Sequence, residues 1–301
     1  MTQILLSYGQ DPTLLANLSI KLLQQVPFTQ ALTLASEDAL VQALRSPAPS
    51  ANLLAITVIH KAARSPSDTA ILSIMQGVIL EYVITWLSTP QVEVGEKATQ
   101  VLGDLLEVDC DRRTSAGLST QMHGLQIASR MPPGQGLLWR RIFQDRQIYQ
   151  TILDLCSPKT VGTAKGQLNE RQKSLAQGRL LRLLPRLAGL DFQTITHTQF
   201  QGIEAEYGVE GGEGLLYFAA AHMVNKEADL LMHYTLIDFF TTFLGAMSVT
   251  DLSKVTVDYL AVLMKKVAGE DETMYKTLEG VATNPETSPE LVELLVRLNE
   301  Y

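Results

Sequence analysis

Five histidines are the residues best suited to metal or acid–base chemistry, but their spacing fits no metal motif. They are His60, His123, His197, His222 and His233. A zinc site needs several nitrogen, sulfur or carboxylate ligands within reach of one another. His222 and His233 lie on either side of a predicted turn, and no cysteine is close to them in the sequence. We expect structural or surface roles for the histidines, with no metal and no cofactor.

Two further features are candidates for catalysis or phosphate binding. Cys110 and Cys156 form no CxxC pair, and the sequence identifies no base that would activate either thiol. The run GVEGGEG at 208–214 superficially resembles a phosphate loop, but no strand precedes it and nearby carboxylates would repel an anion: Glu204, Glu206, Glu210 and Glu213. We expect a flexible acidic turn there and no enzyme activity.

Basic residues cluster once. Arg179, Arg182 and Arg186 follow helical spacing beside a row of leucines, which indicates a basic stripe along one edge of a buried helix. The stripe is either a solvated face or a contact for an acidic partner surface.

The segment 138–149, LWRRIFQDRQIY, combines residue types that dominate protein interfaces. One interpretation gives Arg140, Arg146 and Tyr149 to a partner surface. The other makes the segment core, with Arg140 and Arg146 paired to acids such as Asp145, and the apolar side chains buried: Trp139, Ile142, Phe143 and Ile148.

The elements that must position these residues are helices. Apolar residues recur at helical spacing and hardly any segment alternates with period two, so the fold class is all-α. The clearest helices and their inward residues are 50–64 (Leu53, Leu54, Val58, Ile59, Ala62), 93–107 (Val94, Ala98, Val101, Leu102, Leu105) and 228–245 (Leu231, Leu236, Phe239, Phe240, Phe243). Pro-containing turns separate the helices.

Two weak self-similarities agree on one repeat length. Residues 55–59 align with 98–102 at an offset of 43 residues, and 102–106 align with 236–240 at about three such periods. This length is typical of HEAT and armadillo repeats. We predict a single curved HEAT/armadillo-like solenoid over 1–301 with about six or seven helical pairs, interrupted by an insertion at 111–136 and a shorter loop at 157–168.

Composition restricts the classes of partner. The chain has 301 residues, 46% of them hydrophobic, and a net charge of −8, which disfavours direct nucleic-acid binding. Two cysteines and no basic residue before Lys21 predict a cytoplasmic or also nuclear protein without a targeting signal. The apolar run at 70–88 is long enough to span a bilayer, but Gln76 and Glu81 near its middle favour a buried helix over a membrane span.

Four segments together resemble a known family: EKATQVLGDLLEVD at 96–109, LWRRIF at 138–143, QGRLL at 177–181 and LMHYTLIDFF at 231–240. The family is fungal, consists of HEAT repeats, and carries the name of DNA mismatch-repair proteins. It serves as an assembly chaperone of the proteasome regulatory particle, with the S-five-b-type non-ATPase subunit as animal counterpart. Its members usually form longer arrays, which leaves open whether C-terminal repeats follow Tyr301.

The resemblance implies a C-shaped solenoid whose concave face binds the C-terminal domain of an AAA ATPase subunit of the proteasome base. A large non-ATPase scaffold subunit is a further candidate partner, and we expect a monomer before binding. We interpret the mismatch-repair name as an indirect genetic connection. An adaptor or scaffold of a trafficking or phosphatase complex, and an all-α enzyme, remain the alternatives.

The partner-facing edge is predicted from the helix at 93–107. With the apolar row turned to the core, the candidates on the other edge are Glu93, Glu96, Lys97, Gln100 and Asp104. Arg140 and Tyr149 would extend this edge on the next repeat. Asp104 recurs as Asp238, which favours a structural hydrogen bond or ion pair common to the repeats.

Overall fold

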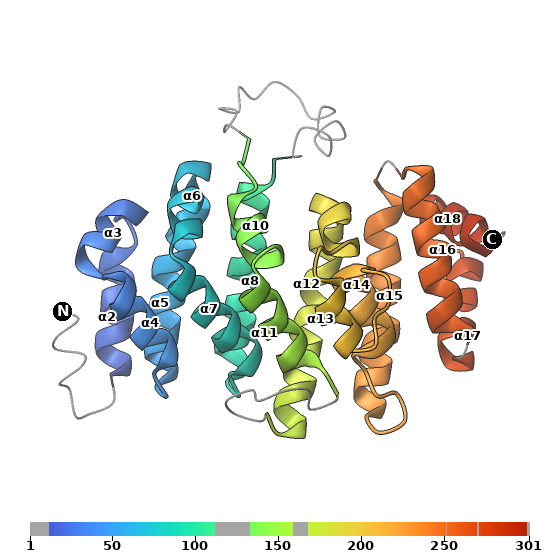
Figure 1. Ribbon diagram of the computed structural model, residues 1–301, viewed down its shortest axis with the longest axis horizontal. Helices are drawn as coiled ribbons and strands as arrows, with labels where there is room; N and C mark the ends of the chain where they lie inside the picture. The colour runs from blue at the N-terminus through green and yellow to red at the C-terminus, as the bar shows by residue number, and fades with distance from the viewer. Residues whose placement is uncertain (1–11, 112–132, 159–167, 251, 270, 300–301) are drawn as a thin grey trace. The chain divides into compact units, whose positions relative to one another are not determined.

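The computed structural model describes residues 12–111, 133–158, 168–250, 252–269 and 271–299, and is all-helical there, as predicted. Helices make up 78% of the structure, and the described ranges contain sixteen α-helices and no strand (Figure 1). The chain divides into two compact units, one formed by 1–155 with 168–179 and the other by 156–167 with 180–301. The single solenoid over 1–301 stays a prediction.

The first unit contains the helices up to the start of α12. They are α2 (Thr13–Leu23), α3 (Phe28–Leu34), α4 (Glu37–Arg45), α5 (Pro49–His60), the 3₁₀ helix η1 (Lys61–Arg64), α6 (Pro66–Ile74), α7 (Gln76–Ser88), α8 (Val92–Asp109), α10 (Leu137–Phe143), α11 (Arg146–Cys156) and the first ten residues of α12 (Glu170–Thr196).

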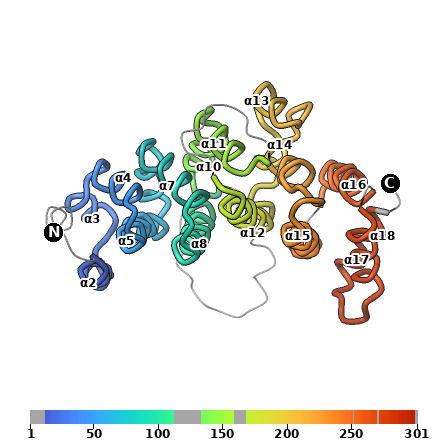
Figure 2. Tube along the Cα trace, turned by 90° about the horizontal axis from the view of Figure 1, so that it is seen from below, coloured from blue at the N-terminus to red at the C-terminus, as the bar shows by residue number. Residues whose placement is uncertain are grey.

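These helices form two layers (Figure 2). In one layer α5 packs between α2 and α8, and in the other α4 packs against α7. The predicted apolar row of α8 is buried throughout. On α5 and η1, Val58, Ile59 and Ala62 are buried as predicted, whereas Leu53 and Leu54 are only half-buried.

The apolar run at 70–88 is not one helix. Met75, with φ −83° and ψ 69°, separates α6 from α7, and the two helices are bent by 93°. Most of α7 is buried, and Glu81 near its middle pairs with Arg45 at 2.6 Å. The prediction of a buried segment is therefore right for α7, and the prediction of a single helix is wrong.

In the layer that contains α4 and α7, buried polar side chains donate to the carbonyls at the ends of the helices. Asn52 of α5 donates to the carbonyls of Ala43 and Leu44 at the end of α4, at 2.9 and 2.8 Å. Arg179 of α12 does the same for α7, whose last carbonyls would otherwise lack partners. Its guanidinium donates to four carbonyl oxygens at 2.8–3.2 Å: Trp86, Leu87, Thr89 and Gln91.

Gly95 of α8 leaves the space that Arg179 occupies. A Cβ atom at Gly95 would lie within 2.3 Å of the guanidinium. Arg179 is only 4% exposed, so its charge is held among carbonyl oxygens. The predicted surface role of Arg179 is therefore wrong.

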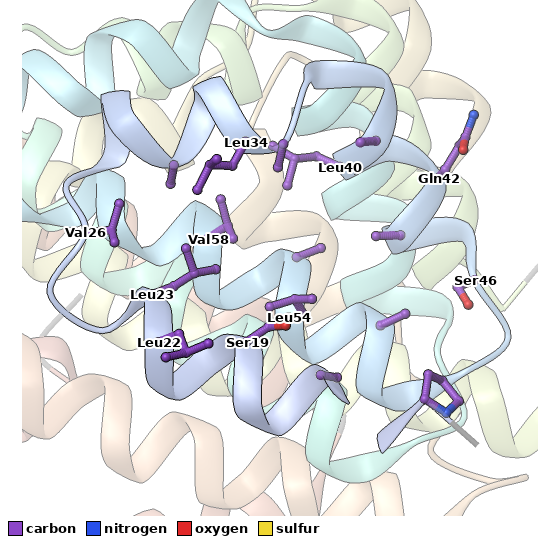
Figure 3. A pocket seen from close by; sticks show the side chains of 18 residues that line it. Ser19, Leu22, Leu23, Val26, Leu34, Leu40, Gln42, Ser46, Leu54 and Val58 are labelled. Atoms are coloured by element: carbon purple, nitrogen blue, oxygen red, sulfur yellow. The ribbon is translucent and has the colours of Figure 1, made fainter. Parts of the chain in front are cut away.

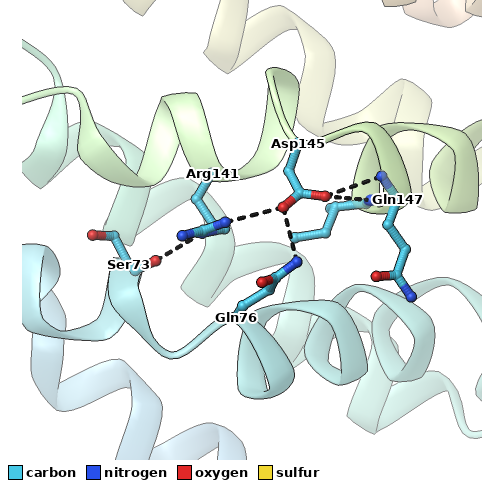
Figure 4. Close-up of polar contacts among 6 residues, drawn as sticks. Ser73, Gln76, Arg141, Asp145 and Gln147 are labelled. Carbon is cyan, nitrogen blue, oxygen red and sulfur yellow. Dashed lines mark hydrogen bonds and ion pairs between the residues drawn. The ribbon is translucent and has the colours of Figure 1, made fainter.

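Asp145 joins two helix corners in the first unit (Figure 4). Its carboxylate accepts from the guanidinium of Arg141 and the amide of Gln76, both at 3.0 Å, and from backbone N–H groups at the start of α11. Arg141 also donates to the carbonyl of Ser73 at 2.9 Å. The predicted pairing of Asp145 with Arg140 or Arg146 is wrong, because Arg141 forms the ion pair with Asp145 instead.

The second unit contains the remainder of α12, which is kinked at Asp191, followed by α13 (Gln201–Glu206), α14 (Gly214–Tyr217), the π-helix η3 (Phe218–His222), α15 (Leu230–Ser248), α16 (Lys254–Ala268), α17 (Glu272–Thr283) and α18 (Pro289–Asn299). Helix α15 buries Leu236, Phe239, Phe240 and Phe243 as predicted. Leu231 is 75% exposed, so its inward assignment is wrong.

Among the described helices, α15 is long and apolar enough to cross a membrane by length and composition alone, and 44% of its apolar window is buried within the fold. The bent pair α6 and α7 passes the same test only if it is counted as one span.

Both predicted loops lie mostly outside the described residues, at 112–132 and 159–167. Hydrogen bonds connect the described residues on either side of the first loop. Gly136, with φ +65°, donates its N–H to the carbonyl of Asp109 at 2.9 Å, and Gly134 donates to that of Cys110 at 3.2 Å. The carboxylate of Asp109 then accepts from the N–H of Leu138 at 2.6 Å and so caps α10.

Replacing Gly95 by alanine tests the Arg179 contact. The added methyl group would displace the guanidinium from the carbonyls at the end of α7, so we expect Gly95→Ala to lower the free energy of unfolding by about 1–3 kcal/mol. Urea denaturation followed by circular dichroism measures it.

Gly178→Ala is the matched control. Gly178 also lies within a helix of the first unit, but a Cβ atom there meets nothing within 4 Å. Alanine should raise the free energy of unfolding by about 0.5–1 kcal/mol through helix propensity. Equal effects of the two substitutions would contradict the proposed contact.

Candidate functional site

The α8 edge consists of Glu93, Glu96, Lys97, Gln100 and Asp104. Glu93, Glu96 and Gln100 are exposed, while Lys97 and Asp104 are half-buried. The helix presents this polar edge because its apolar row, spaced at three and four residues, faces the core. The structure thus brings the five predicted residues onto one accessible side of α8.

His60 connects this edge to α5. Its Nε2 lies 3.0 Å from Oδ2 of Asp104, and the two side chains are 33% and 27% exposed. Burial lowers the pKa of His60, the charge of Lys97 lowers it further, and Asp104 opposes both. The expected structural bond of Asp104 is present, but Asp238 on α15 is exposed, so the bond is not shared by both positions.

The segment 138–149 is mostly core. Trp139, Ile142, Phe143 and Ile148 are buried, and the indole of Trp139 donates to the carbonyl of Leu106 at 2.8 Å. Tyr149 is 2% exposed, so its place on the partner-facing edge is wrong, because helix α11 turns this position toward the core.

Five arginines were candidates for partner contact, and four are exposed. Arg140, on α10, donates to the carbonyl of Gln135 at 3.0 Å, and Arg146 begins α11. Arg182 and Arg186 are exposed on α12 and belong to the second unit. Since Arg179 is buried and committed to α7, the three-residue stripe does not exist as one surface.

His233, a further candidate for chemistry, has a structural partner. His233 and Lys226 both contact Asp271, at 2.7 and 3.0 Å, and Asp271 caps α17 through the N–H of Met274. Burial raises the pKa of Asp271, but hydrogen bonds from Met274, Lys226 and His233 outweigh it and lower the pKa overall. His123 lies outside the described residues.

Both cysteines are buried, and burial raises the pKa of the Cys156 thiol. Within the described ranges, no group of three or more His, Cys, Asp or Glu side chains could hold a metal ion.

The glycine-rich segment is a tight turn. Gly208, Gly211, Gly212 and Gly214 all have positive φ, and the N–H of Gly214 donates to the buried carboxylate of Glu204 at 3.3 Å. Because a carboxylate already occupies a turn amide, the segment does not offer a cradle for phosphate at that position.

Sequence reasoning missed an apolar groove among α2, α3, α4 and α5 (Figure 3). The groove has a volume of about 690 Å³, and alanine and leucine side chains form most of its wall. On α2, Leu14, Leu18 and Leu22 are all more than half exposed, and Leu22 also lines the groove. Their spacing of four was a visible signal of a second apolar stripe on this helix.

Comparison with protein-family models, curated proteins and solved structures finds no match to this chain. A functional proposal for it therefore depends on the geometry of the molecule and on its sequence.

His60 should make stability depend on pH. Its pKa is lower in the folded chain than in the unfolded chain, so the unfolded chain takes up a proton first as the pH falls below about 6.5. This contribution is present near neutral pH and is lost on acidification. Between about pH 7.5 and pH 5, the melting temperature of His60→Gln should therefore fall less than that of the wild type. Equal falls in melting temperature would contradict the lowered pKa of His60.

Tyr149→Ala tests the corrected assignment of that residue. Removal of a buried aromatic ring should lower the free energy of unfolding by about 3–5 kcal/mol. Arg146→Ala, at an exposed position of the same helix, should change it by less than about 0.5 kcal/mol. If chemical denaturation gave equal values for the two variants, Tyr149 would belong to the surface after all.

Proposed function

We propose that the chain is a helical-repeat protein-binding module that acts as an assembly chaperone of the proteasome base. In this proposal the α8 edge receives the C-terminal domain of an AAA ATPase subunit, and no catalysis takes place. The observation that supports it best is the continuity of α5 and α8, whose accessible polar sides meet at the bond between His60 and Asp104.

The order of helices in the first unit supports a HEAT/armadillo-like repeat. Helix α8 begins at Val92, 43 residues after α5 begins at Pro49, which is the offset found in the sequence. A pair of shorter helices precedes each long one: α3 and α4 before α5, α6 and α7 before α8, and α10 and α11 before α12. Such arrays bind partners along rows of equivalent helices.

The family resemblance supports the ATPase as partner. A row of carboxylates, an amide and one lysine fits a folded domain with a charged surface, and does not fit a nucleic-acid backbone. The buried residues Tyr149 and Arg179 are excluded from the proposed surface. Arg140 and Arg146 are exposed, but they lie on the short helices α10 and α11 and are not part of the α8 edge.

A double substitution on the α8 edge tests the function. Glu96→Arg with Gln100→Arg reverses the charge of the edge without entering the core, so the melting temperature should stay within about 2 °C of the wild type. Retention of the ATPase C-terminal domains in a pull-down should fall at least tenfold, because the new positive charges would face groups that complement the wild-type edge.

The control places the same charge change elsewhere. Glu290→Arg on α18 and Gln30→Arg on α3 alter exposed positions and should retain the wild-type level of binding. Undiminished binding by the α8 variant would exclude this edge. Capture of trafficking or phosphatase subunits in place of the ATPases, identified by mass spectrometry of the purified complexes, would overturn the partner.

A further inference from the structure

A second cavity opens beside His60, between α2, α5 and η1. Its volume is about 380 Å³. Four of its lining side chains carry or can carry a positive charge: Lys21, His60, Lys61 and Arg64. The other described lining residues are Ile20, Gln24, Thr57 and Ala63, so none of the described residues that line the cavity is a carboxylate, although His60 bonds to Asp104 behind it.

This concentration of cations is unusual for the region. Between Pro12 and Asp109 the chain has five Lys and Arg residues against nine Asp and Glu. Three of the five line the cavity, and a fourth, Lys97, lies close enough to affect the pKa of His60. Only Arg45 lies elsewhere, paired with Glu81. An acidic chain thus places nearly all the cations of this region around one opening.

The cations retain donors for a ligand. Lys61 donates to the carbonyl of Leu23, and Arg64 donates to that of Gln24 at 2.7 Å, so both cap the C-terminus of α2. An ammonium has three N–H donors and a guanidinium has five. The side chain of Lys21 is exposed and forms no hydrogen bond or ion pair within the described part of the chain.

The positive charges around the cavity also destabilise one another's protonated forms. Lys61 is 5% exposed, and burial followed by the charge of Arg64 lowers its pKa. Burial and the charge of Lys97 act in the same direction on the pKa of His60. A bound anion would reverse this repulsion, since an opposite charge within a few ångströms stabilises the protonated forms.

We propose that this cavity binds a carboxylate side chain from an acidic segment of the protein partner. A carboxylate accepts charge-assisted hydrogen bonds from ammonium and guanidinium groups, the two kinds of cation that line this cavity. The cavity shares His60 with the α5–α8 junction, so one partner can contact the α8 edge and insert an acidic residue here. The inference rests on the proposed function for the partner's identity, and on the cavity for the ligand's charge.

Binding of a fluorescein-labelled oligo-aspartate peptide to the full chain tests this directly. Fluorescence anisotropy at low salt should show saturable binding that weakens as salt is added. Lys21→Glu with Arg64→Glu should raise the Kd at least tenfold. Because Arg64 also caps α2, Lys21→Glu alone is the second variant, and it should raise the Kd several-fold with an unchanged melting temperature.

Lys254→Glu with Lys265→Glu is the control, since it makes the same charge change on exposed positions of α16 and should leave the Kd within twofold. Three outcomes would overturn the inference: no binding by the wild type, equal loss in both double variants, or binding of an oligothymidylate of matched charge in place of the peptide. No ATPase is present in this assay, so its failure is separate from failure of the pull-down.

Discussion

The buried guanidinium of Arg179 is the interaction on which the first unit depends most. Backbone carbonyls at a helix end must find donors when water is excluded, and the end of α7 together with the turn that follows it receives four bonds from this one side chain. Gly95 makes the approach possible, because any larger residue on α8 would occupy the same space. Three helices are thereby fixed at one point: α7 by its carbonyls, α8 by its glycine and α12 by the arginine. The α8 edge owes its position to that junction.

The same device recurs with other side chains. Asn52 closes the end of α4, Asp109 caps α10, and Asp145 caps α11 while reaching the corner between α6 and α7. Helices α4, α10 and α11 are therefore each held by a polar side chain as well as by apolar packing. A binding surface on α5 and α8 gains from this arrangement, since its residues lie on long helices whose neighbours cannot easily shift.

The sequence was sufficient to predict the helical class and the faces of α8, because periodicity alone decides which side of an amphipathic helix is buried. It was misleading wherever burial depends on a partner far along the chain. Arg179 is in the register of an exposed stripe, and only the carbonyls about ninety residues earlier make its burial favourable. Tyr149 has the composition of an interface residue, yet α11 turns it inward. The cavity beside His60 was not predictable, since it combines residues from α2, α5 and η1 that share no motif.

The distance in sequence between α7 and its cap also matters during synthesis. A ribosome releases the chain from the N-terminus, so α7 and α8 emerge long before residue 179 does. Until then the carbonyls at the end of α7 lack the donor that Arg179 supplies in the fold, and the space above Gly95 is not yet filled by its guanidinium. The nascent first unit must therefore wait for the first turns of α12 to complete its polar contacts. Translation pauses upstream of residue 179 would prolong a state in which the junction is still hydrated.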